Sequence, residues 1–144
     1  MILIKPWRFA MPVALPIRSS VFIEEQGVPA DLELDEFDEH AAHALAFEGA
    51  TCIGTARLIQ LHTGAAQIGR MAVLPHDRNQ GWGTQLLQAL IEEGLSQGIS
   101  RFDLHAQVSA ISFYQKQGFI IAGEEYEEAG IPHHNMTLVM HPPL

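Results

Sequence analysis

A short segment with two glycines, Arg78-Asn-Gln-Gly-Trp-Gly83, stands between a predicted strand and a predicted helix. Glycines at the start of a helix leave backbone N–H groups open, and these donors, with the helix dipole, favour an anion such as a pyrophosphate. The alternative is a helix-opening turn whose glycines allow close packing. The candidate phosphate-binding positions are Arg78, which adds a charge, and Asn79, Gln80, Gly81, Trp82, Gly83 and Thr84.

Two common phosphate-binding motifs do not fit this segment. A P-loop requires a lysine after its last glycine, and no lysine follows Gly83. A dinucleotide fingerprint requires a third glycine where this chain has Leu86, and it follows a parallel strand. The strand before Arg78 belongs to a predicted antiparallel meander, so neither a P-loop nor a dinucleotide-binding unit is expected.

The chain has eight histidines, but they do not form a recognisable metal site. His40 and His43 are three residues apart, which places them on opposite faces of a strand, and His133 and His134 are adjacent. Cys52 is the only cysteine, so no zinc ligand set can be assembled from the sequence. We therefore expect no metal. Because Cys52 lies in a predicted strand without a surrounding motif, we also do not expect it to act as a covalent carrier.

The elements that position these residues can be predicted from hydrophobic spacing and turn residues. Leu86, Leu87, Leu90 and Ile91 recur at helical spacing after the glycine segment. Strands are predicted at residues 1–4, 41–47, 51–61, 66–74, 101–105, 119–122 and 136–140, and helices at 16–27, 81–96 and 108–117, with an acidic loop at 29–40. This order predicts an α+β domain with a mixed sheet.

Composition limits the class of protein. A chain of 144 residues suits one domain, 1–144, and its formal charge of −9 argues against a nucleic-acid partner. No apolar run approaches the ~20 residues that span a bilayer, so no membrane segment is expected. The apolar N-terminus is interrupted by prolines and arginines and does not resemble a signal peptide. With a single cysteine, a cytoplasmic location is expected.

Three separated motifs carry a resemblance to a known family. They are Ile68-Gly-Arg-Met-Ala-Val73, the segment Arg78–Gly83 and Phe113-Tyr-Gln-Lys-Gln-Gly-Phe119. In this order and spacing they resemble the GNAT superfamily of N-acetyltransferases, whose pyrophosphate loop reads Arg/Gln-x-x-Gly-x-Gly/Ala and whose last helix ends FYEKxGF. The resemblance covers residues 21–140. The segments 21–26 and 123–134 look like the subgroup typified by ElaA.

The resemblance implies a mixed, mostly antiparallel twisted sheet with flanking helices, and acetyl-CoA as the acetyl donor. In this family a β-bulge splays the strand before the pyrophosphate loop from its neighbour. The freed backbone N–H groups, here expected from Met71, Ala72 and Val73, bind pantetheine and the thioester carbonyl. Gln107 stands where the family often has Asn, and its longer amide can still donate to the pantetheine arm or the leaving group.

The resemblance also implies catalytic roles. Tyr114 corresponds to the usual general acid, and the alternative is a core aromatic residue beside Phe113. Glu25 is expected to be the general base and Glu24 to lie near the acceptor. His133 is expected to contact the acceptor, and His133 and His134 are the other candidate bases. Because adjacent residues on an extended segment point in opposite directions, His133 and His134 cannot both face the site.

The expected reaction is direct attack of a primary amine of a small molecule or peptide on the thioester. The alternatives are a non-catalytic acyl-CoA-binding sensor, or an acyltransferase that uses another acyl-CoA or a hydroxyl acceptor. The acidic stretch at 31–39 favours a cationic acceptor. An apolar edge strand near the C-terminus would allow a homodimer to form.

Overall fold

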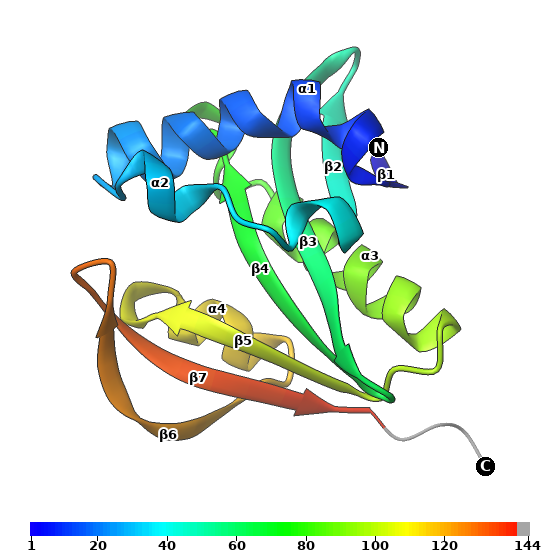
Figure 1. The fold of residues 1–144 in the computed structure, drawn as a ribbon, viewed down its shortest axis with the longest axis vertical. Helices are drawn as coiled ribbons and strands as arrows, with labels where there is room; N and C mark the ends of the chain where they lie inside the picture. The colour runs from blue at the N-terminus through cyan, green and yellow to red at the C-terminus, as the bar shows by residue number, and fades with distance from the viewer. Residues whose placement is uncertain (141–144) are drawn as a thin grey trace.

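The computed structural model describes residues 1–140, which form one seven-stranded sheet in the order β1-β2-β3-β4-β5-β7-β6 (Figure 1). The strands are β1 (Ile2–Lys5), β2 (Ala42–Glu48), β3 (Thr51–His62), β4 (Ala65–Val73), β5 (Arg101–Gln107), β6 (Ile120–Glu128) and β7 (Ile131–Val139). Only β4 and β5 pair in parallel. The sheet confirms the predicted α+β fold. The predicted domain 1–144 includes residues 141–144, which lie outside the described residues.

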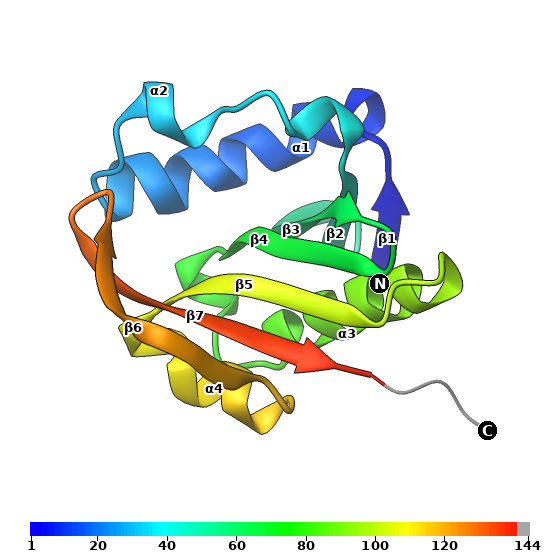
Figure 2. The same cartoon turned by 60° about the horizontal axis from the view of Figure 1, so that its bottom comes forward.

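Helices cover both faces of the sheet (Figures 1 and 2). The helices are α1 (Trp7–Arg18), its π-helical continuation η1 (Ser19–Glu25), α2 (Ala30–Glu33), α3 (Trp82–Ser96) and α4 (Ile111–Lys116). Short 3-10 turns at Asp38–His40, Pro75–Asp77 and Val108–Ala110 connect them to the strands. α1, η1 and α2 lie on one face, while α3 and α4 lie on the other.

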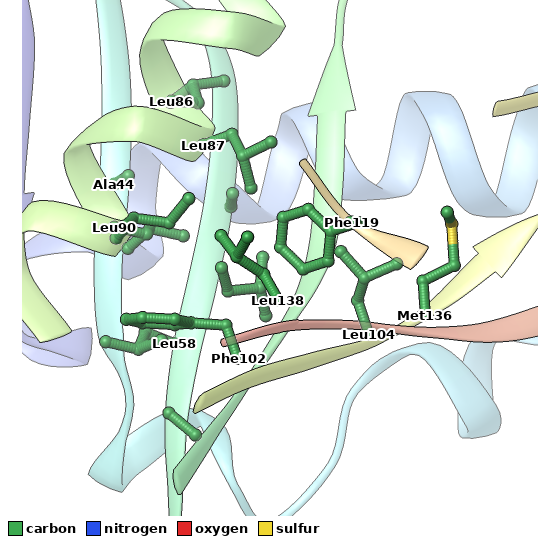
Figure 3. Packing of buried hydrophobic residues seen from close by; sticks show 14 of the residues in the cluster. Ala44, Leu58, Leu86, Leu87, Leu90, Phe102, Leu104, Phe119, Met136 and Leu138 are labelled. Atoms are coloured by element: carbon green, nitrogen blue, oxygen red, sulfur yellow. The ribbon is translucent and has the colours of Figure 1, made fainter. Parts of the chain in front are cut away.

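The main core lies between α3 and the sheet (Figure 3). Leu86, Leu87 and Leu90 of α3 are fully buried, as the helical spacing predicts. Burying each such side chain stabilises the fold by about 1.5–3 kcal/mol. Gly94 permits close packing, because a Cβ there would lie 2.5 Å from Cε1 of Phe102. This packing fixes α3, and with it the glycine segment that precedes the helix.

The prediction that the first helix opens at Pro16 is wrong. The helix begins at Trp7 and contains both Pro12 and Pro16. An interior proline removes a backbone hydrogen bond and costs about 3 kcal/mol, so tertiary packing must offset the two prolines. Its buried face runs at helical spacing through Trp7, Ala10, Ala14, Ile17 and Val21.

The last two strands are longer than the predicted segments 119–122 and 136–140. They form a hairpin, β6–β7, whose turn contains Ala129 and Gly130 with φ of 52° and 76°. The acidic residues 124–128, which precede the turn, therefore lie on β6. β6, not the C-terminal strand β7, is the edge of the sheet, so Ile120 and Ile121, both exposed, are the apolar residues at this edge.

Candidate active site

A cleft opens where β4 and β5 separate. Their parallel pairing runs from Ala65–Arg101 to Ile68–Leu104 and ends there. Beyond this point β4 continues along β3 to Val73, and β5 continues along β7 to Gln107. The register of β3 and β4 shifts at a bulge next to this point, where Arg70 has a φ of 51°. A bulge bends the strand that carries it, so the sequence-predicted splay is present.

The bulge leaves backbone groups of β4 facing the cleft. Just past the strand, the N–H of Leu74 donates to Ile53 O on the β3 side. Because backbone groups alternate between the two edges of a strand, the N–H groups of Val73 and Met71 face the other edge. The carbonyl oxygen of Val73 accepts from Nε of Arg78 at 2.9 Å, which is consistent with this orientation.

The cleft has a volume of about 1070 Å³, the size of a large small-molecule site. It brings together twelve of the predicted site residues: Met71, Ala72, Val73, Arg78, Asn79, Gly81, Trp82, Gly83, Thr84, Gln107, Tyr114 and His133. Three predicted residues lie outside its lining. Gln80 donates to the carbonyl of His76 at 3.2 Å, and Glu24 and Glu25 lie at the exposed end of η1.

The glycine segment forms a tight turn at the start of α3. Asn79 and Gly81 have φ of 63° and 88°, the left-handed conformation that glycine adopts without strain. No side chain caps the helix, so its first N–H groups remain open for an anion. Gly83 also allows close packing, because a Cβ there would lie 3.3 Å from Cζ of Phe113. The two interpretations of this segment are therefore compatible.

Arg78 connects the glycine segment to η1. Its two terminal nitrogens donate to the two carboxylate oxygens of Glu25 at 2.7 and 2.6 Å, across 53 residues of sequence. The hydrogen bonds and charge of Arg78 lower the pKa of Glu25. A carboxylate that is held in this way is a weaker proton acceptor, so the geometry does not favour Glu25 as the base. The roles of Glu24 and Glu25 stay predictions.

Tyr114 lies on the cleft wall and also belongs to the core. Its hydroxyl is 3.9 Å from Sδ of Met71 on β4, and its ring packs edge-on against Phe113 and Phe119. Burial raises the pKa of Tyr114 to about 12, so the phenol keeps its proton at neutral pH. The hydroxyl lies against the side chain of Met71 on β4, and both residues line the cleft.

Gln107 and Gln26 bridge the open end of the splay. The amide nitrogen of Gln107 donates to Oε1 of Gln26 at 2.9 Å. Gln26 follows η1 and lines the cleft with Gln107. This contact, between residues 81 positions apart, could not be predicted from the sequence.

A polar cluster on β5, β6 and β7 lines the cleft opposite β4. Nδ1 of His105 lies 2.9 Å from Oε1 of Glu128, and Nε2 of His133 lies 3.8 Å from Oε2 of the same carboxylate. Tyr126 stacks on the ring of His133 with 6.0 Å between centroids. The sequence analysis missed Glu128 and His105. Strand pairing brings the three strands together, because His105 of β5 pairs with Asn135 of β7, and Glu128 of β6 pairs with Ile131 of β7.

A network of three arginines and three carboxylates ties the acidic stretch to the sheet. Its members are Arg18, Arg57, Arg70, Glu33, Asp35 and Asp38. Asp38 is buried and accepts from Arg18 and Arg57 at 2.7 and 2.9 Å. The three acids are thus counter-ions of arginines in the same chain. This corrects the view that the whole stretch attracts a cationic acceptor.

Neither a metal site nor a membrane-spanning helix is found among residues 1–140. Among residues 1–140, no group of three or more His, Cys, Asp or Glu side chains could hold a metal ion. Within the same residues no helix is long and apolar enough to cross a membrane.

Comparison with known proteins identifies the family. The acetyltransferase (GNAT) domain family matches residues 17–140. The uncharacterized N-acetyltransferase YjcF of Bacillus subtilis is 35% identical over 124 residues, 85% of this chain and 88% of YjcF. Escherichia coli ElaA is 32% identical over 127 residues, 85% of this chain and 83% of ElaA.

Solved structures agree with the sequence comparison. The crystal structure of Escherichia coli ElaA superposes with a TM-score of 0.83 at 28% identity, over 95% of this chain and 99% of that chain. An acyl-CoA N-acyltransferase from Pseudomonas aeruginosa superposes with a TM-score of 0.85 at 27% identity, over 95% and 97% of the two chains. The chain therefore belongs to the GNAT acetyltransferase family, among relatives that include ElaA.

Proposed function

We propose that this protein transfers the acetyl group of acetyl-CoA to a primary amine of a small molecule or peptide, by direct attack. The family supports acyl transfer. The observation that carries the proposal is the splay between β4 and β5, which leaves the N–H groups of Met71 and Val73 facing a cleft next to the uncapped start of α3. This arrangement suits a ligand with a phosphate end and a carbonyl end.

Residues from both sides of the cleft would hold the donor. The open N–H groups of residues 81–84 suit a pyrophosphate, and Arg78 can add a charge-assisted hydrogen bond if its contact with Glu25 is exchanged. When bound, acetyl-CoA supplies an acetyl group activated as a thioester. The N–H groups of Met71 and Val73 would donate to the oxygen on which negative charge develops, and each such donor is worth about 3–4 kcal/mol.

Tyr114 is proposed to protonate the departing thiolate. A phenol with a pKa of about 12 is a weaker acid than an ordinary thiol, at about 8.5. Proton transfer is therefore uphill and must accompany cleavage of the C–S bond, through a hydrogen bond that strengthens as charge develops. The high pKa has one advantage, since the acid remains protonated throughout the neutral pH range.

Thermal melting tests the assignment of the donor. A ligand at about a hundredfold excess over its Kd stabilises the folded state by about 2.7 kcal/mol, so acetyl-CoA and coenzyme A should raise the melting temperature by several degrees. NADH is the matched control, because it also carries a pyrophosphate and an adenosine. No shift with any CoA species at millimolar concentration would contradict the proposal.

Turnover tests the catalytic role. With a panel of amines, wild-type protein should release coenzyme A, and Tyr114→Phe should lower kcat by about 10²-fold or more with nearly unchanged coenzyme A affinity. Equal turnover of the two proteins would exclude Tyr114 as the acid. Binding without turnover on any amine would favour the sensor alternative. A series of acyl chain lengths and hydroxyl acceptors would identify a different transfer reaction.

A further inference from the structure

The cluster of His105, Glu128 and His133 lies on the side of the cleft formed by β5, β6 and β7, and its hydrogen bonds indicate which ring nitrogens carry a hydrogen. Nδ1 of His133 lies 2.7 Å from the carbonyl oxygen of Ile131. A carbonyl oxygen only accepts hydrogen bonds, so Nδ1 carries the hydrogen. In the neutral ring the lone pair must then lie on Nε2, the nitrogen that faces Glu128.

Nε2 of His133 and Oε2 of Glu128 together form a site for an ammonium group. Their separation of 3.8 Å exceeds a hydrogen bond. A nitrogen atom placed about 2.8 Å from each, an ordinary hydrogen-bond distance, would bridge the two acceptors. A primary ammonium has three such hydrogens and a positive charge that complements the carboxylate. Both residues line the same cleft as the backbone donors of β4.

Neighbouring side chains hold the two acceptors in place. A carboxylate can only accept, so Nδ1 of His105 donates to Oε1 of Glu128 at 2.9 Å and orients the carboxylate. Tyr126 stacks on the ring of His133, and its hydroxyl donates to Asn135. His133 is 6% exposed, so its ring has little freedom to turn away from the cleft.

We propose that Nε2 of His133 is the general base that takes the proton from the acceptor ammonium, and that Glu128 binds the ammonium and stabilises the imidazolium. This inference rests on the proposed function. The first proton passes from the ammonium to His133 and then to solvent. The neutral amine forms the C–N bond as the C–S bond breaks, the thiolate takes a proton from Tyr114, and the second amine proton is lost to solvent as the phenol is reprotonated.

The surroundings of this base are otherwise nearly neutral. Among the described residues, the titratable groups in contact with His133 or Glu128 are Tyr126 on β6 and His105 on β5. On the opposite cleft wall, the guanidinium groups of Arg57 and Arg70 are each paired with Asp35. Among the described residues no arginine pairs with Glu128, whose ion-pair partners are His105 and His133.

The test compares His133→Asn with wild-type protein over pH 6 to about 10. Asparagine keeps a donor near the position of Nδ1 and removes the base at Nε2. At neutral pH kcat/KM for the amine should fall about 10²-fold or more. The deficit should narrow as pH approaches the pKa of the acceptor amine, about 10.4 for a lysine-like group, because the amine then loses its proton unaided.

Controls separate chemistry from folding. His62→Asn is the matched control, because Nδ1 of His62 also contacts a neighbouring carbonyl, that of Thr63, at 3.2 Å, outside the cleft lining. It should leave activity unchanged. Glu128→Gln changes a half-exposed residue and should lower kcat/KM about tenfold, mainly through KM. The melting temperature and coenzyme A affinity of each variant verify that the fold and the donor site are intact.

Three outcomes would overturn the inference. If wild-type protein turns over and the kcat/KM of His133→Asn lies within twofold of the wild-type value, His133 is not the base. The same holds if the kcat/KM of the variant is lower by the same factor at every pH. Both results would leave the proposed function standing. Absence of turnover in wild-type protein on any amine would overturn both proposals.

Discussion

Replacing Asp38 by asparagine should strongly destabilise the fold. Asp38 is 1% exposed and accepts three hydrogen bonds, two from Arg18 and one from Arg57, at 2.7, 3.1 and 2.9 Å. The amide would remove one negative charge and turn an NH2 group toward a guanidinium. The buried arginines would keep their charge, and removing one partner of a buried ion pair costs about 3–5 kcal/mol.

This loss of unfolding free energy can be converted into a change of melting temperature. At about 2.1 cal/mol/K per residue, the 144 residues unfold with an entropy of about 0.3 kcal/mol/K. The loss of about 3–5 kcal/mol therefore lowers the melting temperature by about 10–17 °C. Asp31→Asn is the matched control. Asp31 is exposed in the same acidic stretch, and its replacement should change the unfolding free energy by less than about 0.5 kcal/mol.

The destabilisation should depend on pH in a defined direction. Burial by itself would raise the pKa of Asp38, but the hydrogen bonds and charges of Arg18 and Arg57 outweigh burial and lower it. A lowered carboxylate pKa stabilises the fold above the unfolded-state value, about 3.9, and this stability is lost as pH falls through the folded-state pKa. Plots of unfolding free energy against pH for wild-type protein and Asp38→Asn should therefore be far apart at pH 7 and should begin to converge below about pH 4.

Urea unfolding between pH 3 and 8 measures this difference directly. If Asp38→Asn lowers the unfolding free energy at pH 7 by less than about 1 kcal/mol, where about 3–5 kcal/mol is expected, Asp38 is not an internal counter-ion. A difference that persists unchanged to pH 3 would show that the effect comes from packing and not from charge.

Two further substitutions test the donor site and the core. Glu25→Gln should free Arg78 for a phosphate and raise coenzyme A affinity by up to about fivefold, since an exposed ion pair is worth about 1 kcal/mol or less. Calorimetry measures this affinity, with Glu24→Gln as the control. Equal or weaker binding by Glu25→Gln would contradict a phosphate contact of Arg78. Gly94→Ala should lower the melting temperature by several degrees, because a Cβ 2.5 Å from Phe102 overpacks the core and reduces the unfolding free energy by about 1–3 kcal/mol. An unchanged or higher melting temperature would mean that the Phe102 ring moves without cost.

Local signals made part of the structure predictable. The helix after the glycine segment begins within one residue of its predicted start and ends at the predicted Ser96, because leucines at helical spacing and the flanking glycines lie within the element itself. The three meander strands are also close to their predicted bounds. The glycine segment could be identified because its residues are contiguous.

Elements that depend on tertiary contacts were harder to predict. Pro16 indicated the start of a helix by local preference, but the helix begins at Trp7, which is buried against the sheet with Leu45 of β2. The predicted strand 119–122 ended before the acidic residues 124–128, yet an edge strand tolerates them because most of its side chains remain exposed.

The sequence alone determined the family and most of the order of the elements, since contiguous motifs and local hydrophobic spacing carry them. Only the tertiary structure decided which charges are neutralised and which face the cleft. Glu25 meets Arg78 across 53 residues, Asp38 meets Arg57 across 19, and His105 meets Glu128 across 23. These pairings arise from strand register and helix packing, and no local preference of the chain encodes them.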